Sequence, residues 1–135
     1  IHLHPRDVGG AILSIDEMTP PKAWLWASSS WEKNVRTEVC NYLNGVHIQS
    51  KDPESMMRSW ERALGKEAVY EDNLFKIQLE GSRIVFVEDI DGRGEGIEAF
   101  EINVNDKEKV LKSAKSKGLI RNDEVYIGGV KFLLN

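Results

Sequence analysis

The chain has 135 residues, of which 41% are hydrophobic and 30% are charged, and its formal net charge is −4. These values are typical of one globular domain, or of a small domain with an additional segment. The acidic balance gives no electrostatic basis for nucleic acid binding, and no apolar run approaches the roughly 18 residues of a membrane helix. We therefore expect neither nucleic acid nor a membrane among the partners.

The first 16 residues predict a hairpin. The sequence IHLHPRDVGGAILSID indicates a strand, a turn from Asp7 to Gly10, and a second strand from Ala11 to Ile15. An isolated hairpin is only marginally stable in water, so we expect it to pair with a neighbouring chain or to fold along the edge of the following domain. The chain begins inside a predicted strand without an initiator methionine, which indicates a fragment of a longer protein.

Residues 17–41 predict a linker that carries aromatic side chains. Pro20 and Pro21 resist regular structure. Three of the four tryptophans lie between residues 24 and 31, and we expect them to pin the linker to the domain surface, with ligand stacking as the alternative. Cys40, the one cysteine, has no activating base near it in the sequence. It is expected to be an inert thiol, and its inability to form an internal disulfide favours a reducing, cytoplasmic location.

Residues 45–65, GVHIQSKDPESMMRSWERALG, predict a strand followed by a well-capped helix. In the strand, His47 and Gln49 lie on one face with Gly45, opposite Val46 and Ile48. Asp52 followed by a proline is a helix start signal, and Gly65 is a stop signal. The core face of the helix is predicted to contain Met56, Met57, Trp60, Ala63 and Leu64.

The remaining residues complete this unit and repeat it. Strands are expected at 67–71, 74–79 and 83–87, so the first unit is βαβββ. The charged, glycine-rich segment 89–96, DIDGRGEG, lacks the acidic ladder and closing Glu of a calcium hand, and it is expected to connect two units. A second strand and helix follow in IEAFEINVNDKEKVLKSAKSKG, residues 97–118, with Val110, Leu111 and Ala114 inward. Three short strands then end the second βαβββ unit, at 119–122, 125–128 and 130–134.

Two tandem βαβββ units resemble the vicinal oxygen chelate superfamily, which includes glyoxalase I, methylmalonyl-CoA epimerase, extradiol dioxygenases and bleomycin-resistance proteins. The resemblance implies an α+β fold in which paired units form a curled sheet around a cavity. It covers residues 42–135 as a full domain, with units 42–92 and 93–135. HPRDVGG, within residues 1–16, is similar to the closing hairpin of a preceding unit of this kind.

The resemblance also implies a divalent metal held by His, Glu or Gln on the first and last strands of each unit. Counted from the helix caps and by the hairpin pattern, the ligand positions fall on residues that are poor ligands. These are Ser14, Gly45, Phe86, Ala99 and Leu133. Shifted by two residues, the same positions offer His47, Glu88, Glu101 and Lys131. We predict no metal site, while His47 and Glu101 are the candidates if one exists. His2 and His4 form a His-x-His pair and are expected to be structural.

The sequence therefore predicts a glyoxalase-like domain with degenerate metal positions that binds a small molecule. The cavity is expected to be lined by His47, Gln49, Glu88, Glu101, Asn103 and Lys131. One alternative is a metal-dependent lyase, isomerase or dioxygenase of the glyoxalase type. Another is a structural domain that serves dimerisation, and the superfamily resemblance itself favours a homodimer.

Overall fold

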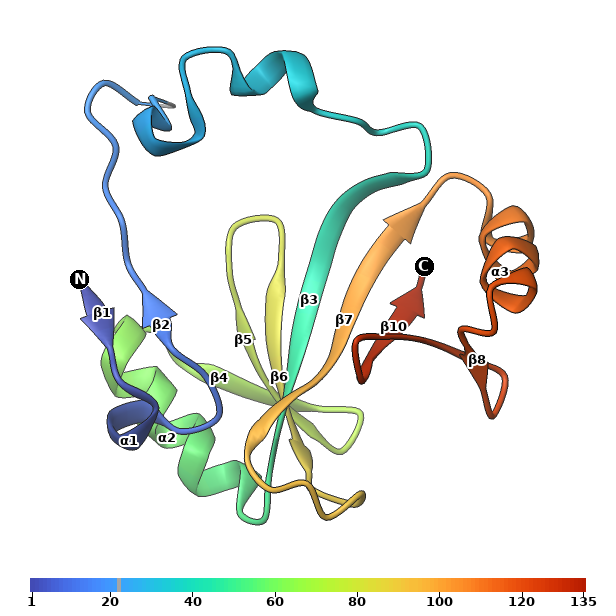
Figure 1. Cartoon of the computed structure of the whole chain (residues 1–135). Coiled ribbons are helices and arrows are strands. Elements are labelled where there is room, and N and C mark those ends of the chain that lie inside the picture. Colours follow the sequence, from blue (N-terminus) through green and yellow to red (C-terminus); the bar gives the residue numbers. More distant parts are fainter. Residues whose placement is uncertain (22) are drawn as a thin grey trace.

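The computed structural model describes residues 1–21 and 23–135, and its main feature is one eight-stranded mixed sheet (Figure 1). Among the described residues, no helix is both long and apolar enough to cross a bilayer. The first unit contains β3 (Cys40–Ser50), α2 (Pro53–Leu64), β4 (Ala68–Glu71), β5 (Leu74–Gln78) and β6 (Arg83–Glu88). The second contains β7 (Gly96–Val104), α3 (Lys107–Ser116), β8 (Ile120–Arg121), β9 (Glu124–Ile127) and β10 (Val130–Leu134).

The strand order shows that the two units are arranged alike. The sheet runs β4-β5-β6-β3-β7-β10-β9-β8. The first strands of the two units, β3 and β7, pair antiparallel at its centre, and each pairs on its outer side with the parallel last strand of its own unit. From the centre outwards, both halves therefore have the same order. The predicted α+β fold of paired βαβββ units is confirmed, and the sheet remains open at both edges.

The helices begin and end where the sequence predicted, because the capping side chains make their expected bonds. A carboxylate oxygen of Asp52 accepts from the backbone N–H of Ser55 at 2.9 Å, and Asp106 accepts from Lys109 at 2.9 Å. Gly65 ends α2 in the left-handed region with φ 63°. These matching caps hold the two helices in equivalent positions in the two units.

Both helices cover the same face of the sheet. Val46, which packs under α2, pairs in register with Phe100 on β7, so these two side chains lie on the same face. Ile102, two residues after Phe100 and therefore on that face too, packs under α3. The core under α2 is large and includes Ile48, Met56, Met57, Trp60, Ile77, Ile84 and Phe86. The buried core under α3 is smaller and consists of Ala114, Val125 and Leu134. The other face carries no helix, and we call it the helix-free face.

The N-terminal segment packs on α2 through side chains. It contains β1 (His2–Leu3), α1 (Pro5–Val8) and β2 (Leu13–Ser14), and its two strands pair only with each other. Val8 is buried in the core under α2, and Trp60 Nε1 donates to the carbonyl of Gly9 at 3.2 Å. The hairpin therefore folds against the domain through α2, and its two strands do not join the eight-stranded sheet. Pairing with a neighbouring chain stays a prediction.

The segment that joins the hairpin to β3 runs in an arc away from the sheet (Figure 1). It forms two short 3-10 helices, η1 (Leu25–Ala27) and η2 (Trp31–Asn34). The ring of Trp24 meets that of Trp26 edge-on at 5.0 Å, and Trp26 is 77% exposed. Within the described residues, neither hydrophobic core includes a tryptophan of this segment. Trp24 and Trp26 therefore pack against each other within the linker, and the expected contact of these rings with the domain surface stays a prediction.

Candidate functional site

Charged side chains gather on the helix-free face, across the middle of the sheet. His47 on β3, Arg83 on β6, Glu101 on β7 and Lys131 on β10 all lie on this face by strand register. Between them Ala99 and Val85 are fully buried although no helix covers them. The sheet is strongly twisted (Figure 1), and the long charged side chains of this face pair with one another over it. The charged groups are thus partly shielded from solvent.

Glu101 is the centre of this arrangement. Its Oε1 lies 2.7 Å from Nε2 of His47 and 3.2 Å from Nε of Arg83, while its Oε2 lies 2.7 Å from Nη2 of Arg83. Burial alone would raise the pKa of Glu101, but the hydrogen bonds from Arg83 and His47 hold that pKa below its usual value. The carboxylate is therefore ionised, buried and fully partnered. The same pairing raises the pKa of Arg83.

A second network continues from the far side of His47. Lys131 Nζ lies 2.7 Å from a carboxylate oxygen of Glu98 and 3.4 Å from one of Glu124. Nδ1 of His47 is 3.9 Å from the other oxygen of Glu98, so His47 lies between both networks. Tyr126, opposite Lys131 in the strand register, donates to Glu124 at 3.2 Å. Burial raises the pKa of Tyr126, which keeps its hydroxyl protonated.

The metal positions implied by the fold resemblance do not fit a metal here. Gly45 has no side chain, and a Cβ at this position would lie 2.9 Å from the carbonyl oxygen of Arg83 and 3.4 Å from Cδ of Glu101. The Arg83–Glu101 pair therefore occupies the space that a ligand side chain would need. Phe86 is buried in the core under α2, on the other face. Among the described residues, no three His, Cys, Asp or Glu side chains gather as metal ligands.

The shifted positions do not provide a metal site either. His47 and Glu101 do meet, but Glu101 is already neutralised by Arg83, and Lys131 brings a second cation to the same face. A metal ion there would have to displace a guanidinium group that already balances the buried carboxylate. We derive no metal-dependent step for this face.

The other residues expected in the cavity lie apart from this centre. Gln49 is buried at the end of β3 against the loop after β6. Asn103 lies towards the opposite end of the sheet and accepts from Asn41 at 2.7 Å. Glu88 pairs in register with Ser50, on the face of Ile48 and Phe86, and its side chain is exposed. The expectation that Glu88 shares the face of His47 is wrong, because residues of β6 alternate and Arg83 and Val85 take that face.

Two residues of this charged arrangement were missed from the sequence. Arg83 opens β6 directly after a turn, and only its pairing with Gly45 brings it onto Glu101. Glu98 lies at an irregularity where the pairing of β3 with β7 shifts between His47 and Ile48, and this shift directs it towards Lys131. The alternation of β6 could have indicated Arg83. No local pattern indicates Glu98.

A hollow of about 390 Å³ adjoins the Arg83–Glu101 pair. Its size is within the range of small-molecule sites, roughly 300–1,000 Å³. Its walls combine charged groups with apolar side chains near the end of β10. They include Arg83, Glu101, Glu124, Lys107, Leu133 and Phe132.

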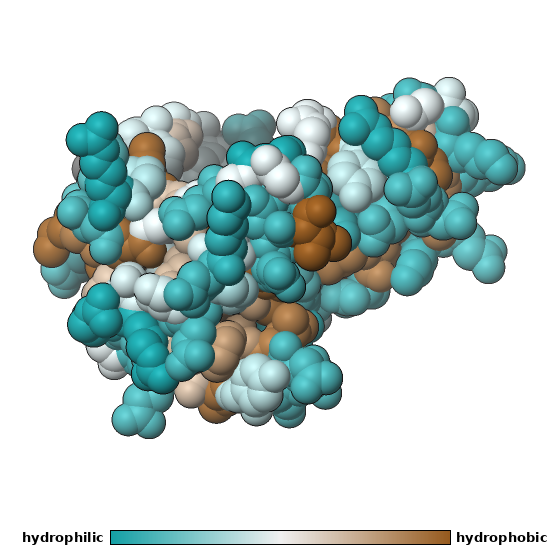
Figure 2. Space-filling model, turned by 90° about the horizontal axis from the view of Figure 1, so that it is seen from below, coloured by the Kyte–Doolittle hydropathy of each residue, from teal (hydrophilic) through white to brown (hydrophobic). Residues whose placement is uncertain are grey.

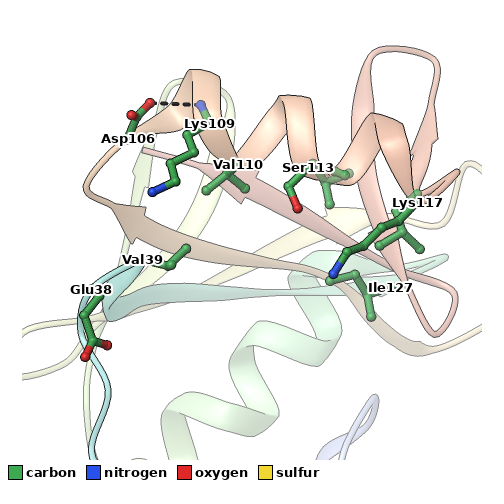
Figure 3. A pocket seen from close by; sticks show the side chains of 11 residues that line it. Glu38, Val39, Asp106, Lys109, Val110, Ser113, Lys117 and Ile127 are labelled. Atoms are coloured by element: carbon green, nitrogen blue, oxygen red, sulfur yellow. Dashed lines mark hydrogen bonds between the residues drawn. The ribbon is translucent and has the colours of Figure 1, made fainter.

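A separate hollow of about 330 Å³ lies on the helix side, under α3 (Figure 3). Val39, Val110 and Ile127 extend into the space between α3 and the strands (Figure 3). The side chains of Lys109 and Lys117 extend from α3 and also line this space. This groove exists because α3 carries small side chains such as Ala114 where α2 carries Trp60. It is mainly apolar, and none of His47, Arg83, Glu101 and Lys131 lines it.

Comparison with known proteins identifies the fold. Neither a family model nor a curated protein gives a significant match. Among solved structures, the chain is similar to methylmalonyl-CoA epimerase from Mycobacterium tuberculosis, with TM-score 0.53 and 18% identity over 74% of this chain and 90% of that one. A methylmalonyl-CoA epimerase in complex with methylmalonyl-CoA and NH4+ gives TM-score 0.52 and 14% identity, over 70% and 93%.

A hypothetical protein from Staphylococcus aureus gives TM-score 0.56 and 11% identity, over 92% of this chain and 47% of that one. Identities this low are informative about fold and not about activity. The chain has the glyoxalase-like fold of the vicinal oxygen chelate superfamily, as the repeat predicted.

Proposed function

We propose that the helix-free face binds a small polar organic molecule without a metal ion, beside the Arg83–Glu101 pair. The observation that carries this proposal is the bidentate bond between Arg83 and the buried carboxylate of Glu101 directly over Gly45. A cation of the chain itself thus balances the carboxylate where the fold resemblance implies a metal. This supports ligand binding by hydrogen bonds and charge.

Arg83 can serve the ligand as well as Glu101. Its side chain is 41% exposed and borders the 390 Å³ hollow. Nε and Nη2 donate to Glu101, and Nη1 has no hydrogen-bond partner among the described residues. A planar guanidinium suits carboxylate and carbonyl oxygens. The proposed ligand therefore carries such an oxygen towards Arg83 and an apolar part towards Leu133.

Ligand binding can be tested with two probes, malonate and methylmalonyl-CoA, by calorimetry on the purified chain. The second probe is chosen because it is bound in a structure of the same fold. We expect measurable binding of at least one probe, and we expect Arg83→Met to weaken it about 10-fold or more, as the loss of a charge-assisted hydrogen bond would. Arg58→Met is the matched control, because Arg58 is an exposed arginine paired with Glu54 on the outside of α2. Equal binding by both variants would contradict the proposed site.

Metal analysis of the same protein separates this proposal from the enzyme alternative. A metal-dependent lyase, isomerase or dioxygenase would retain stoichiometric Zn, Mn, Ni or Fe, and Glu101→Ala would lose it. That result would overturn the metal-free site. Retention of binding by metal-stripped protein would support it.

Homodimerisation also stays a prediction. In Figure 2, hydrophobic residues form separate patches between hydrophilic ones on the face seen from below. This face does not favour a large apolar interface, so a dimer would use another surface or the sheet edges. Sedimentation of the purified chain tests this, and a monomer at all concentrations would contradict it. The cytoplasmic location remains a prediction from the single free cysteine, Cys40.

A further inference from the structure

The groove under α3 corresponds to the side of α2 on which the N-terminal hairpin packs. Asp52 and Asp106 cap the two helices, so residues at the same distance from these caps are equivalent in the two units. The hollow between the hairpin and α2 is lined on the helix side by Asp52, Ser55, Met56 and Ser59. All four equivalent residues of the second unit line the groove, namely Asp106, Lys109, Val110 and Ser113. The two units therefore use the same side of their helices.

On α2 this side is covered by protein. Val8 of the hairpin is buried in the core there, and Trp60 donates to the carbonyl of Gly9. A Cβ added to Gly9 would lie only 2.9 Å from Cε of Met56, so the hairpin and the helix are in direct contact. The apolar side chains of α2 at this place are therefore shielded from water.

On α3 the same side has no such cover among the residues that the structure describes. Val39 at the edge of the groove is 55% exposed, and Ile127 is 49% exposed. Ala114 takes the position of Trp60 and leaves space between the helix and the strands (Figure 3). The groove is thus an apolar surface of the second unit that the described part of the chain leaves open.

The groove carries positive charge that the covered side of α2 lacks. Lys109 and Lys117 line it at positions where α2 has Ser55 and Ala63. Neither ammonium group forms an ion pair within the described part of the chain. At about 1.5 Å per residue, the two lysines stand roughly 12 Å apart along the helix, one towards each end of the groove.

The two acidic residues that line the groove do not pair with these lysine side chains. Asp106 is engaged as the helix cap, where it accepts from the backbone N–H of Lys109 at 2.9 Å. The carboxylate of Glu38 points away from α3 (Figure 3). Two cations without an ion-pair partner in the described chain therefore border a surface that is otherwise mainly apolar.

We propose that the groove binds a single-chain amphipathic carboxylate, such as an ionised medium-chain fatty acid. Its apolar chain would lie along α3 over Val39 and Ile127, where the burial of apolar surface supplies the affinity. Its carboxylate would pair with Lys109 or Lys117, according to the direction in which the chain enters. Arg83 does not line this groove, so the proposal does not depend on the function proposed above.

The extent of the groove favours a small molecule over a protein partner. Its volume of about 330 Å³ lies at the lower end of the range for small-molecule sites. Beyond its rim, α3 presents the exposed residues Lys112, Lys115 and Ser116, so the apolar strip is narrow. A stable protein interface usually buries about 800 Å² on each partner around an apolar centre. The strip therefore fits one chain of methylene groups better than it fits a helix or a strand.

The test is calorimetric titration of the purified chain with decanoate and, separately, with decylammonium, which has the same chain length and the opposite charge. We expect one decanoate to bind per chain and decylammonium to bind more weakly. Lys109→Met combined with Lys117→Met should weaken decanoate binding about 5-fold and remove the preference for the anion, as the loss of exposed ion pairs would. Lys112→Met combined with Lys115→Met is the matched control, because it makes the same charge change on the same helix outside the groove. It should leave decanoate binding unchanged.

A second variant places a negative charge in the groove without disturbing the core. Val39→Glu changes an exposed side chain and should weaken decanoate binding at least as much as the double lysine change. Val69→Glu is its control, since Val69 is 54% exposed but lies on β4 and does not line the groove. Arg83→Met should retain decanoate binding. Loss of binding in Arg83→Met would place decanoate in the other hollow and overturn the assignment to this groove.

Three further results would overturn the proposal. These are no heat with decanoate, equal affinity for decanoate and decylammonium, and unchanged decanoate binding in Val39→Glu. Sedimentation of the same proteins identifies the competing occupant. A dimer that Val39→Glu dissociates, with no heat from decanoate, would mean that a second copy of the chain fills the groove.

Discussion

Arg83 and Glu101 form a two-point ion pair across the centre of the sheet, with Nη2–Oε2 at 2.7 Å and Nε–Oε1 at 3.2 Å. The two residues come from the last strand of one unit and the first strand of the other, and each pairs in register with Gly45. The missing side chain of Gly45 makes room for the pair. One glycine thus removes a ligand position and admits the ion pair that replaces it.

The ion pair should stabilise the fold mainly by keeping Glu101 partnered. Arg83→Met removes the guanidinium and leaves a buried carboxylate with His47 as its one remaining donor. We expect a loss of about 2–3 kcal/mol in the free energy of unfolding, measured in urea, with the part exposure of Arg83 keeping the loss moderate. The control Arg58→Met breaks an exposed helix pair and should cost about 0.5 kcal/mol or less. An equal loss of unfolding free energy in Arg83→Met and Arg58→Met would show that the carboxylate of Glu101 is solvated.

The lowered pKa of Glu101 predicts a specific dependence of stability on pH. Its folded-state pKa lies below the unfolded value of 4.5, so the folded state binds fewer protons than the unfolded state near that pH. The stabilisation is therefore present above pH 4.5 and is lost as the pH falls through the folded-state pKa. Glu101→Gln removes this titration.

Urea unfolding of the original chain and of Glu101→Gln between about pH 7 and pH 3 measures this effect. The stability difference between the two proteins should be largest near neutrality and should shrink in acid. A difference that stays constant over this range would show that the folded and unfolded pKa values of Glu101 are the same.

Gly45 should tolerate no side chain. In Gly45→Ala the new Cβ meets the backbone carbonyl of Arg83 at 2.9 Å, a contact that cannot be relieved by a change of rotamer. We expect a loss of about 1–3 kcal/mol, typical of overpacking. Gly96→Ala is the matched control on the neighbouring strand, because its Cβ would meet nothing within 4 Å. It should be neutral or slightly stabilising. A neutral Gly45→Ala would show that the backbone at Arg83 shifts to admit the new Cβ.

The regular parts of the fold could be predicted because their causes are local. Asp52 with Pro53 and Gly65 mark the ends of α2 by chemistry within a few residues, and the spacing of Met56 and Trp60 gives its buried face. Alternation along β3 similarly placed His47, and alternation along β7 placed Glu101, on the face opposite the main core residues. The two units then followed from the repetition of these signals.

The site was only partly predictable because its contacts depend on strand register. Register between distant strands is set by the whole sheet, so the approach of Arg83 to Glu101 has no local signal. The same reason applies to Gln49 and the loop that encloses it. The error at Glu88 has a different cause. The expected ligand position on β6 was shifted by two residues, as on β3, but the face of Glu88 depends on how β6 pairs with β3, which the sequence does not show.

The N-terminal hairpin should be held on α2 by close packing at Gly10. This residue has φ 71°, and a Cβ added to it would overlap the Cγ2 methyl of Ile48. Gly10→Ala should therefore release the hairpin, while the eight-stranded sheet keeps its own core. Gly10→Ala introduces both backbone strain, from the positive φ, and overlap with Ile48. Gly81→Ala introduces the strain alone, because Gly81 has φ 76° but open space around it, so it is the control for the overlap.

Limited proteolysis within the exposed linker, followed by gel filtration without denaturant, measures the release. The hairpin fragment should stay with the domain in the original chain and in Gly81→Ala, and it should separate in Gly10→Ala. Trp60→Phe should give partial release, because it removes the 3.2 Å bond to the carbonyl of Gly9 while retaining most of the apolar contact. Retention of the fragment in Gly10→Ala would show that Val8 and the rest of the segment hold the hairpin without this close approach.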